Sequence, residues 1–332
     1  MPIADVAMTP EQFRSLTRQL EDALAIAVVG QREVVRGVLT AILAGGHVLL
    51  EGAPGLGKTL LVRTLAESLQ LDFSRIQFTP DLMPADVTGT TLIVEDGAGH
   101  RAFQFQPGPI FSHLVLADEI NRATPKTQSA LLESMQEHHV TVARTTYTLP
   151  EPFLVLATQN PIEMEGTYPL PEAQLDRFLF KLLVPYPGLD DLVEIAARTT
   201  SRLKWSIPRV ADGPTILQMI ALARELPVAT PVLRYAARLV QNSHPDALQS
   251  PAQVRRFVRY GASPRGVQAL ILGGKIRALL DGRLNVAFAD VRASALPSLR
   301  HRVILNFEAD AENATTDQVV QAVLAATPEA ET

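Results

Sequence analysis

A glycine-rich stretch near the start of the chain has the residue types and spacing of a phosphate-binding loop. Residues 52–59 match the pattern G-x-x-x-x-G-K-[ST] from end to end. Glycines let the backbone fold around an anion with several N–H groups pointing inward, and a helix that begins there adds its positive N-terminal dipole. Lys58 is placed to reach the β- and γ-phosphates of a nucleotide, and the Thr59 hydroxyl is placed to ligate Mg²⁺. The residues expected to surround the phosphates are Gly52, Ala53, Pro54, Gly55, Leu56, Gly57, Lys58, Thr59 and Leu60.

Two adjacent acids, Asp118 and Glu119, follow the apolar run Leu114–Ala117. A strand with this ending delivers both acids to the carboxyl edge of a parallel sheet, where ligands bind. We expect Asp118 to hold Mg²⁺ through its water shell, because this ion gives up water reluctantly. Glu119 is the candidate to polarise an attacking water. By itself such a strand end is about as often an N-cap or a surface pair, so this interpretation depends on the phosphate loop before it.

A third polar strand end is the segment Thr158-Gln159-Asn160-Pro161, which follows the apolar run Phe153–Ala157. The neutral amide of Asn160 could orient a water and contact the γ-phosphate without adding charge. Asn-Pro is equally common in turns. Taken alone, the segment leaves both readings open.

These loops need a sheet that brings them to one edge. Short apolar runs alternate with helical patterns over the first 188 residues, which implies a parallel sheet with helices on both faces. Two further pairs of runs, 92–94 with 102–105 and 140–142 with 147–149, are predicted to form hairpins. The expected strands are His47–Leu50, Phe73–Phe78, Leu114–Ala117, Phe153–Ala157 and Phe178–Val184, and the expected helices are 10–25, Arg32–Ala44, Lys58–Leu69 and Thr127–His138.

The spacing of apolar residues becomes mainly helical after Pro185-Tyr186-Pro187-Gly188. We therefore expect two domains in an α/β fold. Residues 1–188 form the nucleotide-binding domain, a parallel sheet sandwiched by helices with two β-hairpin inserts. Residues 189–332 form a smaller, all-helical lid, whose acidic, alanine-rich tail after Phe307 holds one helix.

Composition excludes several classes of protein. The chain has 332 residues, of which 47% are hydrophobic and 20% charged, so wholesale disorder is excluded, and its lack of Cys excludes disulfides, thiol catalysis and Cys-ligated zinc. The net charge of −5 argues against a dominant nucleic-acid footprint. The longest apolar stretch, Val38–Leu50, is too short to span a bilayer, and the N-terminus does not resemble a signal peptide. The expected compartment is the cytoplasm.

The motifs together resemble those of the AAA+ ATPases, and within them the MoxR family, a neighbour of the magnesium-chelatase ATPase subunits. The resemblance covers about residues 15–308. It rests on the phosphate loop and on four further segments, LVLADEINRA at 114–123, ATQNP at 157–161, LPEAQLDRF at 170–178 and GASPRG at 261–266. The resemblance implies a sheet order of 5-1-4-3-2, a helical lid, ATP and Mg²⁺ as cofactors, and ring hexamers.

The resemblance also assigns roles to single residues. Asn160 becomes the sensor-1 residue. Arg177 becomes the arginine finger, reaching the γ-phosphate of the neighbouring subunit, and Arg265 the sensor-2 residue, reaching the same nucleotide from the lid. The two hairpins match the family's insert in the second helix and its hairpin before sensor 1. The adenine is expected against Val28, Val29 and Gln31.

The chemistry supports these roles, because a guanidinium fork stabilises the negative charge that spreads over a γ-phosphoryl group during transfer. Three alternatives stay open. Arg177 could form a local ion pair with Asp176. Arg265, in the first turn of a helix that Ser263-Pro264 begins, could be solvated; the helix dipole disfavours a cation there, so an anionic partner such as ATP is expected. Arg122 and Arg144 are further candidates for contacts between subunits.

For the exposed surface, Phe103 and Phe105 alternate with glutamines, which favours a packed hairpin face over a surface that grips a substrate. The function that the resemblance implies is a ring-forming ATPase that remodels or matures a protein partner in a chaperone-like way, which can include cofactor insertion. Its expected partners are further copies of itself, a separate protein with a von Willebrand factor A domain, and a client complex. The alternatives are a nucleic-acid-dependent motor, against which the scarcity of basic residues in the hairpins argues, and a metal-chelatase subunit.

Overall fold

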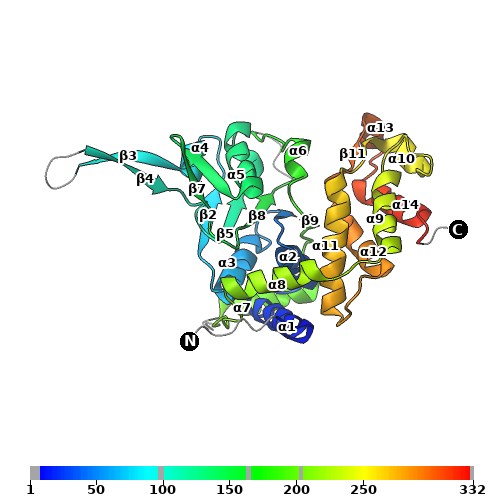
Figure 1. Ribbon diagram of the computed structural model, residues 1–332, viewed down its shortest axis with the longest axis horizontal. Coiled ribbons are helices and arrows are strands. Elements are labelled where there is room, and N and C mark those ends of the chain that lie inside the picture. The colour runs from blue at the N-terminus through cyan, green and yellow to red at the C-terminus, as the bar shows by residue number, and fades with distance from the viewer. Residues whose placement is uncertain (1–7, 96–100, 162–165, 202–204, 330–332) are drawn as a thin grey trace.

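A five-stranded parallel sheet forms the centre of the first part of the chain (Figure 1). The computed structural model describes residues 8–95, 101–161, 166–201 and 205–329. The strand order β2–β5–β8–β1–β9 is the 5-1-4-3-2 order that the family resemblance implied, read from the other edge. All five expected strands are present, as β1 (Val48–Glu51), β2 (Phe73–Gln77), β5 (Leu114–Asp118), β8 (Leu154–Gln159) and β9 (Phe180–Leu183).

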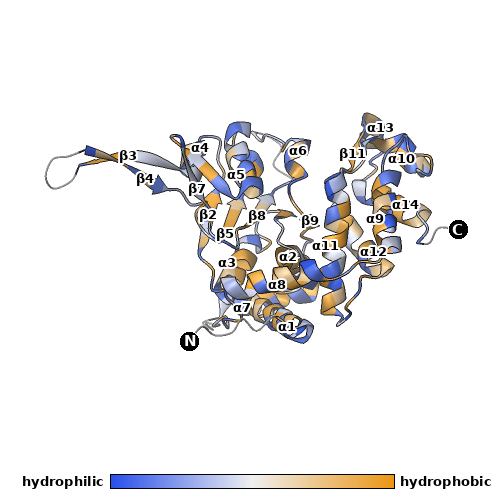
Figure 2. Ribbon diagram, viewed as in Figure 1, coloured by the Kyte–Doolittle hydropathy of each residue, from blue (hydrophilic) through white to orange (hydrophobic). Residues whose placement is uncertain are grey.

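Helices cover both faces of this sheet, as the sequence predicted. Alternate residues of one strand enter different clusters: Leu114 and Leu116 of β5 pack with helices α1, α2 and α3, whereas Val115 and Ala117 pack with α4 and α5. This is the pattern of a strand buried on both faces. The outer helices carry hydrophobic and hydrophilic residues together, as amphipathic helices do (Figure 2). The helices are α1 (Pro10–Ala27), α2 (Arg32–Leu43), α3 (Lys58–Ser68), α4 (Pro84–Thr88) and α5 (Pro125–Glu137).

Local signals in the sequence set the start of α1. The Thr9 hydroxyl accepts a hydrogen bond from the Gln12 N–H at 3.2 Å, and the Gln12 side chain accepts one from the Thr9 N–H at 2.8 Å. This capping box satisfies two N–H groups at the helix end. The buried positions then follow helical spacing, through Phe13, Thr17, Leu20 and Leu24.

Both expected hairpins are present, and the first is longer than predicted. Strands β3 (Gly89–Glu95) and β4 (Arg101–Pro107) pair in antiparallel register and reach far out from the body of the molecule (Figure 1). The expected turn at 96–99 lies outside the described residues. Phe105 stacks on Tyr147 with ring centroids 3.9 Å apart, whereas Phe103 is 80% exposed, so the packed face that we expected includes only one of the two phenylalanines. The second hairpin joins β6 (His139–Val142) and β7 (Thr145–Thr148).

The second part of the chain is mainly helical, with α11 as its long central helix (Figure 1). Two details differ from the expectation: β10 and β11 form a short antiparallel pair, and the tail holds two helices, α13 and α14. Within the described residues no single helix is long and apolar enough to cross a membrane, although α8 and α9 together, bent by 97° at a short break, pass by length and composition. The elements are α6 (Glu172–Leu175), α7 (Leu189–Thr200), α8 (Gly213–Glu225), α9 (Thr230–Asn242), α10 (Ala252–Phe257), β10 (Val258–Tyr260), α11 (Pro264–Leu280), α12 (Phe288–Leu299), β11 (Ile304–Leu305), α13 (Phe307–Ala311) and α14 (Thr316–Ala326).

Candidate active site

The glycine-rich loop connects the end of β1 to the start of α3. Gly55 and Gly57 have φ angles of +80° and +78°, in the left-handed region that favours glycine. A Cβ atom at either position would meet none of the described atoms within 4 Å, so the space beside the loop is open. Gly57 is also the N-cap of α3, and the helix therefore points its positive end at this space. Loop and helix form a candidate phosphate cradle.

Lys58 is folded back over this loop. Its ammonium group donates hydrogen bonds to the carbonyl oxygens of Gly52 and Ala53, the latter at 3.1 Å. Burial lowers the pKa of Lys58, while the nearby carboxylates of Asp118, Glu119 and Glu51 oppose this effect. A phosphate group in the cradle would supply the negative charge that favours the protonated ammonium.

The sheet register brings the polar strand ends together. Gln77 of β2 lies beside Asp118 of β5, and Glu51 of β1 lies beside Gln159 of β8. The residues that follow these positions therefore share one edge: the phosphate loop after β1, Glu119 after β5, and Asn160 after β8. Asn160 is buried. Leu60, in the first turn of α3, is 42% exposed and sits at the border of this group.

Thr59 and Asp118 offer the oxygen atoms that a magnesium ion prefers. The Thr59 hydroxyl oxygen lies 3.5 Å from Oδ2 of Asp118, and Asp118 is buried. One hydroxyl and one carboxylate fit the way in which Mg²⁺ binds, with few protein ligands, several waters and the phosphates of the substrate. The donor set therefore fits the ion that the sequence predicted. Within the described residues there is no group of three or more His, Cys, Asp or Glu placed to hold a metal.

Both acids are held by neighbours that the sequence reasoning missed. Arg75 of β2 donates to Oδ2 of Asp118 from Nη2 at 2.7 Å and from Nε at 3.1 Å. The Thr158 hydroxyl donates to Oδ1 of Asp118 at 2.5 Å and accepts the Glu119 N–H at 2.8 Å. Glu119 itself has a φ of +55°, which costs a non-glycine residue about 1–3 kcal/mol. The Thr158 bridge therefore fixes a strained backbone beside the phosphate cradle.

The carboxylate of Glu119 is also held from two sides. Gln77 donates to Oε2 at 2.8 Å, and Arg122 donates to the same oxygen at 2.9 Å. Arg122, a candidate for contacts between subunits, thus lies inside the site of its own chain. A sequence signal for Arg75 and Gln77 did exist: they alternate with apolar Ile76 on a strand at the edge of the sheet, so their side chains share one face.

The three residues expected at the adenine do not line one common pocket. Gln31 donates to the carbonyl of Leu56 in the phosphate loop at 2.8 Å, which ties the segment before α2 to the cradle. It lines a pocket of about 620 Å³ together with Gly30, Leu183 and Pro185. Val28 lines a neighbouring pocket of about 450 Å³. Val29 belongs to the segment that connects α1 to α2 and is half-buried. Of the three predicted residues, Gln31 is therefore the one that the structure joins directly to the phosphate loop.

Arg177 and Arg265 lie on the side of the sheet where β1 begins, away from the phosphate loop at its carboxyl end. The Leu179 N–H donates to the carbonyl of His47 at 2.9 Å, which places the segment after Arg177 at the amino end of β1. The phosphate loop follows the carboxyl end of β1. The four residues of β1 span about 13 Å at about 3.3 Å each. Arg177 and Arg265 line one shared pocket of about 350 Å³, together with His47. The structure thus brings the two arginines together and separates them from Lys58.

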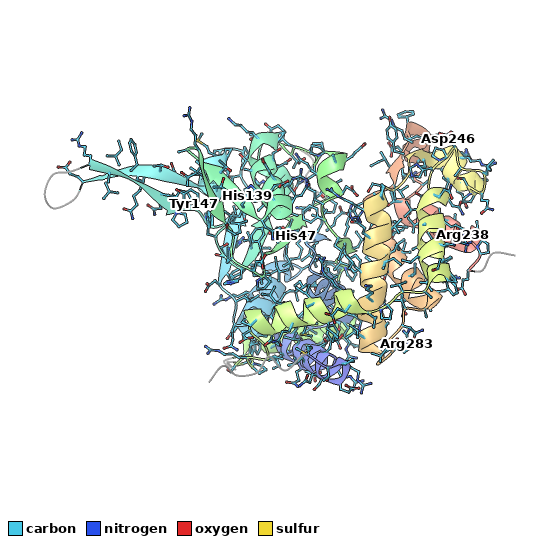
Figure 3. The ribbon with its side chains drawn as sticks, in the orientation of Figure 1. His47, His139, Tyr147, Arg238, Asp246 and Arg283 are labelled. Carbon is cyan, nitrogen blue, oxygen red and sulfur yellow. The ribbon has the colours of Figure 1, made fainter. Side chains whose placement is uncertain are left out.

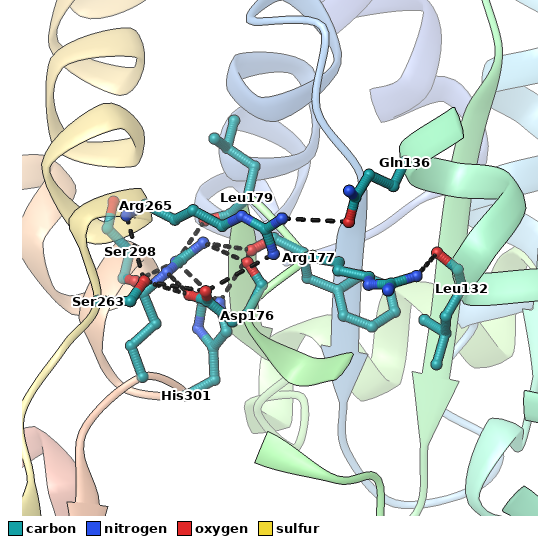
Figure 4. Close-up of polar contacts among 11 residues, drawn as sticks. Leu132, Gln136, Asp176, Arg177, Leu179, Ser263, Arg265, Ser298 and His301 are labelled. Atoms are coloured by element: carbon teal, nitrogen blue, oxygen red, sulfur yellow. Dashed lines mark hydrogen bonds and ion pairs between the residues drawn. The ribbon is translucent and has the colours of Figure 1, made fainter. Parts of the chain in front are cut away.

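The alternatives for these arginines can now be compared with the contacts (Figure 4). The guanidinium of Arg177 donates to the Leu132 carbonyl, and the carboxylate of Asp176 faces Arg265 and Arg302 instead of its sequence neighbour. Arg265 is in the first turn of α11, as predicted, and donates to the Gln136 side chain at 3.2 Å. Its nearest anion is Asp176, at 3.7 Å, so the partner that the helix dipole demanded comes from the same chain.

His47, near the centre of the molecule, joins three elements at this edge (Figure 3). Its Nε2 donates to the Met135 carbonyl and its Nδ1 accepts the Val155 N–H, both at 3.0 Å. Each ring nitrogen is used, so a second proton would break the bond to Val155. Burial lowers the pKa of His47 to about 4.

This burial predicts acid destabilisation. The folded protein keeps His47 neutral while the unfolded chain protonates it below its ordinary pKa of 6.5. Stability is therefore complete above pH 6.5 and falls as the pH drops towards 4, by about 3 kcal/mol for this residue. Urea unfolding at steps between pH 7.5 and 4.5 measures the loss. His47→Gln should reduce the slope in this range and leave the part due to His301, whose pKa burial also lowers, whereas the control His139→Gln should leave the slope unchanged. Equal slopes in wild type and His47→Gln would contradict the assignment.

Comparison with known proteins gives consistent results. A family model described as "ATPase family associated with various cellular activities (AAA)" matches residues 47–180, and one described as "AAA lid domain" matches residues 251–323. The Bacillus subtilis protein YeaC is 44% identical over 95% of each chain. The Mycobacterium tuberculosis protein named Chaperone MoxR1 is 42% identical over 90% of this chain and 78% of its own. A crystal structure of a Cytophaga hutchinsonii protein assigned as an ATPase superposes with a TM-score of 0.89 at 39% identity, covering 96% of each chain.

Proposed function

The chain belongs to the MoxR family of AAA+ ATPases, and on this premise we propose that it hydrolyses ATP with Mg²⁺ in a ring of six identical subunits and uses the energy to remodel or mature a protein partner. The domain boundary proposed with it is Gly188, before the helical lid. The client is a protein complex, and a separate protein with a von Willebrand factor A domain is the proposed adaptor. The compartment proposed is the cytoplasm, where ATP is supplied.

One observation carries the proposal of a ring. The phosphate cradle follows the carboxyl end of β1, whereas the segment that carries Arg177 lies at the amino end of this strand, whose four residues span about 13 Å. Arg265 shares a pocket with Arg177. These arginines cannot serve the nucleotide of their own subunit across that length. A head-to-tail contact would place them at the cradle of a neighbour, and head-to-tail contacts whose rotation closes form rings. Supplying an arginine from the next subunit makes hydrolysis depend on assembly.

Within one site the chain's own residues divide the work. The loop N–H groups and Lys58 bind the phosphates, and Glu119, fixed by Gln77 and Arg122, accepts a proton from the attacking water. Asn160 orients that water. When bound by Thr59 and Asp118, Mg²⁺ would offset the negative charge of the phosphates. Arg75 holds the Asp118 carboxylate, whose Oδ2 lies beside the Thr59 hydroxyl.

Dilution tests the proposed function. The specific ATPase activity should rise steeply with protein concentration, in parallel with the transition from monomer to ring followed by analytical ultracentrifugation in ATP and Mg²⁺. The reason is that the cradle of a lone subunit has no neighbouring subunit to supply Arg177 and Arg265 to it. Activity per subunit that is independent of concentration, in a protein that stays monomeric with saturating ATP, would falsify the proposal. A pull-down with the Glu119→Gln variant in ATP then identifies the client.

A further inference from the structure

Arg302 is a buried arginine in the helical domain, in the segment between α12 and β11. Its side chain is only 2% exposed. A buried cation is costly unless it is paired and fully hydrogen-bonded. Nε of Arg302 donates to Oδ1 of Asp176 at 2.9 Å, and burial lowers the pKa of Arg302 only to about 10, so the guanidinium stays charged at neutral pH.

Other N–H groups of Arg302 donate hydrogen bonds to backbone carbonyl groups on both sides of Arg177. They donate to the carbonyl oxygens of Asp176 at 3.2 Å, Phe178 at 2.8 Å and Leu179 at 3.1 Å. Nε2 of the neighbouring His301 lies between the two groups, 2.9 Å from Nη1 of Arg302 and 3.0 Å from the Phe178 carbonyl oxygen. The segment that carries Arg177 is thus fastened to the helical domain of its own chain, more than 120 residues away in sequence.

The same cluster continues to Arg265 (Figure 4). The Ser263 hydroxyl donates to the carboxylate of Asp176 at 2.9 Å and accepts the Arg265 N–H at 3.2 Å. Ser263 is the N-cap of α11, so the helix that carries Arg265 begins on the carboxylate that Arg302 holds. Arg302 and Asp176 therefore connect the backbones that carry Arg177 and Arg265.

We propose that Arg302 is a positioning residue that locks Arg177 and Arg265 into one rigid unit, so that both reach the nucleotide of the neighbouring subunit together. This inference rests on the proposed function, which places those two arginines in the neighbour's site. Arg302 acts on the two arginines through the backbone of residues 176–179 and the carboxylate of Asp176, while a further bond to the Ser298 carbonyl anchors its guanidinium to the end of α12. The lid and the arginine-bearing segment then move as one body against the neighbour.

The planar fork of arginine is what this role needs. It offers donors in fixed directions to a carboxylate and four carbonyl groups at once, whereas a lysine offers one ammonium point. Arg302→Lys keeps the charge and releases the backbone around Arg177. Small misplacements of a catalytic group cost large factors in rate, about 100-fold for 1 Å. The expected effect is at least a tenfold loss of kcat with KM changed less than twofold, since the phosphate cradle is at the other edge of the sheet.

The test uses rings mixed from two variants. An arginine donor carries Glu119→Gln and keeps Arg177 and Arg265; an ATP-site subunit carries Arg177→Ala and keeps Glu119. Each alone is inactive, and the mixture restores hydrolysis at the interfaces where both intact halves meet. Arg302→Lys is then added to one partner at a time. In the donor it should lower the restored kcat at least tenfold, and in the ATP-site subunit less than twofold.

A merely structural role predicts the same loss in either partner, and that result overturns the proposal, as does an unchanged kcat with Arg302→Lys in the donor. Restoration by the substituted ATP-site subunit also shows that the variant folds and assembles.

Asp176→Asn should repeat the donor-only loss. The matched control is Arg300→Lys: the side chain of Arg300 is 11% exposed, pairs with Asp317 at 2.8 Å and binds the Lys181 carbonyl at 3.3 Å, and its hydrogen bonds go to these two residues instead of residues 176–179. If the parent mixture restores no activity, the shared site of the proposed function fails and this inference falls with it.

Discussion

A protein carrying Glu119→Gln is expected to bind ATP as tightly as the wild type and to hydrolyse it about 10²- to 10⁴-fold more slowly. The substitution keeps the size of the side chain and one acceptor oxygen, and it replaces the basic oxygen with an NH₂ donor. Gln77 and Arg122 can still donate to the amide oxygen of the new side chain. The binding surface should therefore be preserved while proton transfer is lost.

Two measurements separate these effects. Fluorescent-nucleotide titration gives the affinity, and phosphate release gives the turnover. The control is Lys58→Ala, which removes the ammonium group over the phosphate loop and should abolish binding itself. Turnover within threefold of the wild type in Glu119→Gln would show that another group activates the water.

The sheet could be predicted because its signal is local. Apolar runs such as Leu114–Ala117, buried on both faces, stand out from their surroundings, and the phosphate loop and its two acids are defined by short motifs. Elements of two or three residues, such as β10 and β11, carry too few side chains to show a period. The exposure of Phe103 beside the packed Phe105 depends on how far the hairpin extends beyond Tyr147, which alternation alone does not reveal.

Contacts between distant segments were the part of the site that sequence reasoning could not reach. The ion pair of Asp176 with Arg302 joins residues 126 positions apart, and no spacing rule applies at that separation. Arg75 and Asp118 were nearer to prediction, because the implied sheet order places β2 beside β5 and the alternation around Ile76 sets the face. The register that brings the two side chains together came from the structure. For Arg265 the dipole argument correctly required an anion, yet a carboxylate of the same chain supplies it. The helix dipole thus predicted that Arg265 needs an anion, and the tertiary structure determined that this anion is Asp176.

Arg177→Ala is expected to lower the ATPase turnover of the assembled protein about 10³-fold while leaving the ATP affinity of dilute subunits unchanged. The guanidinium lies at the sheet edge opposite the phosphate loop, so its loss should not alter binding to its own subunit. The matched control is Arg144→Ala, which removes an exposed arginine at the β6–β7 turn that was a second candidate for contacts between subunits. Its turnover should stay within twofold of the wild type.

The contacts of Arg177 also explain how it can act in a neighbour's site. Its guanidinium now donates to a neutral acceptor, the Leu132 carbonyl, whereas a phosphate group offers a full negative charge and a bidentate contact that the planar fork matches. Exchange of one acceptor for the other is therefore favourable when a neighbour's nucleotide arrives, and the backbone bonds from Arg302 keep the origin of the side chain fixed meanwhile. Adding Glu119→Gln subunits to Arg177→Ala subunits should restore hydrolysis. An Arg177→Ala protein that turns over normally, or one whose ATP affinity falls in dilute solution, would place this arginine outside the shared site.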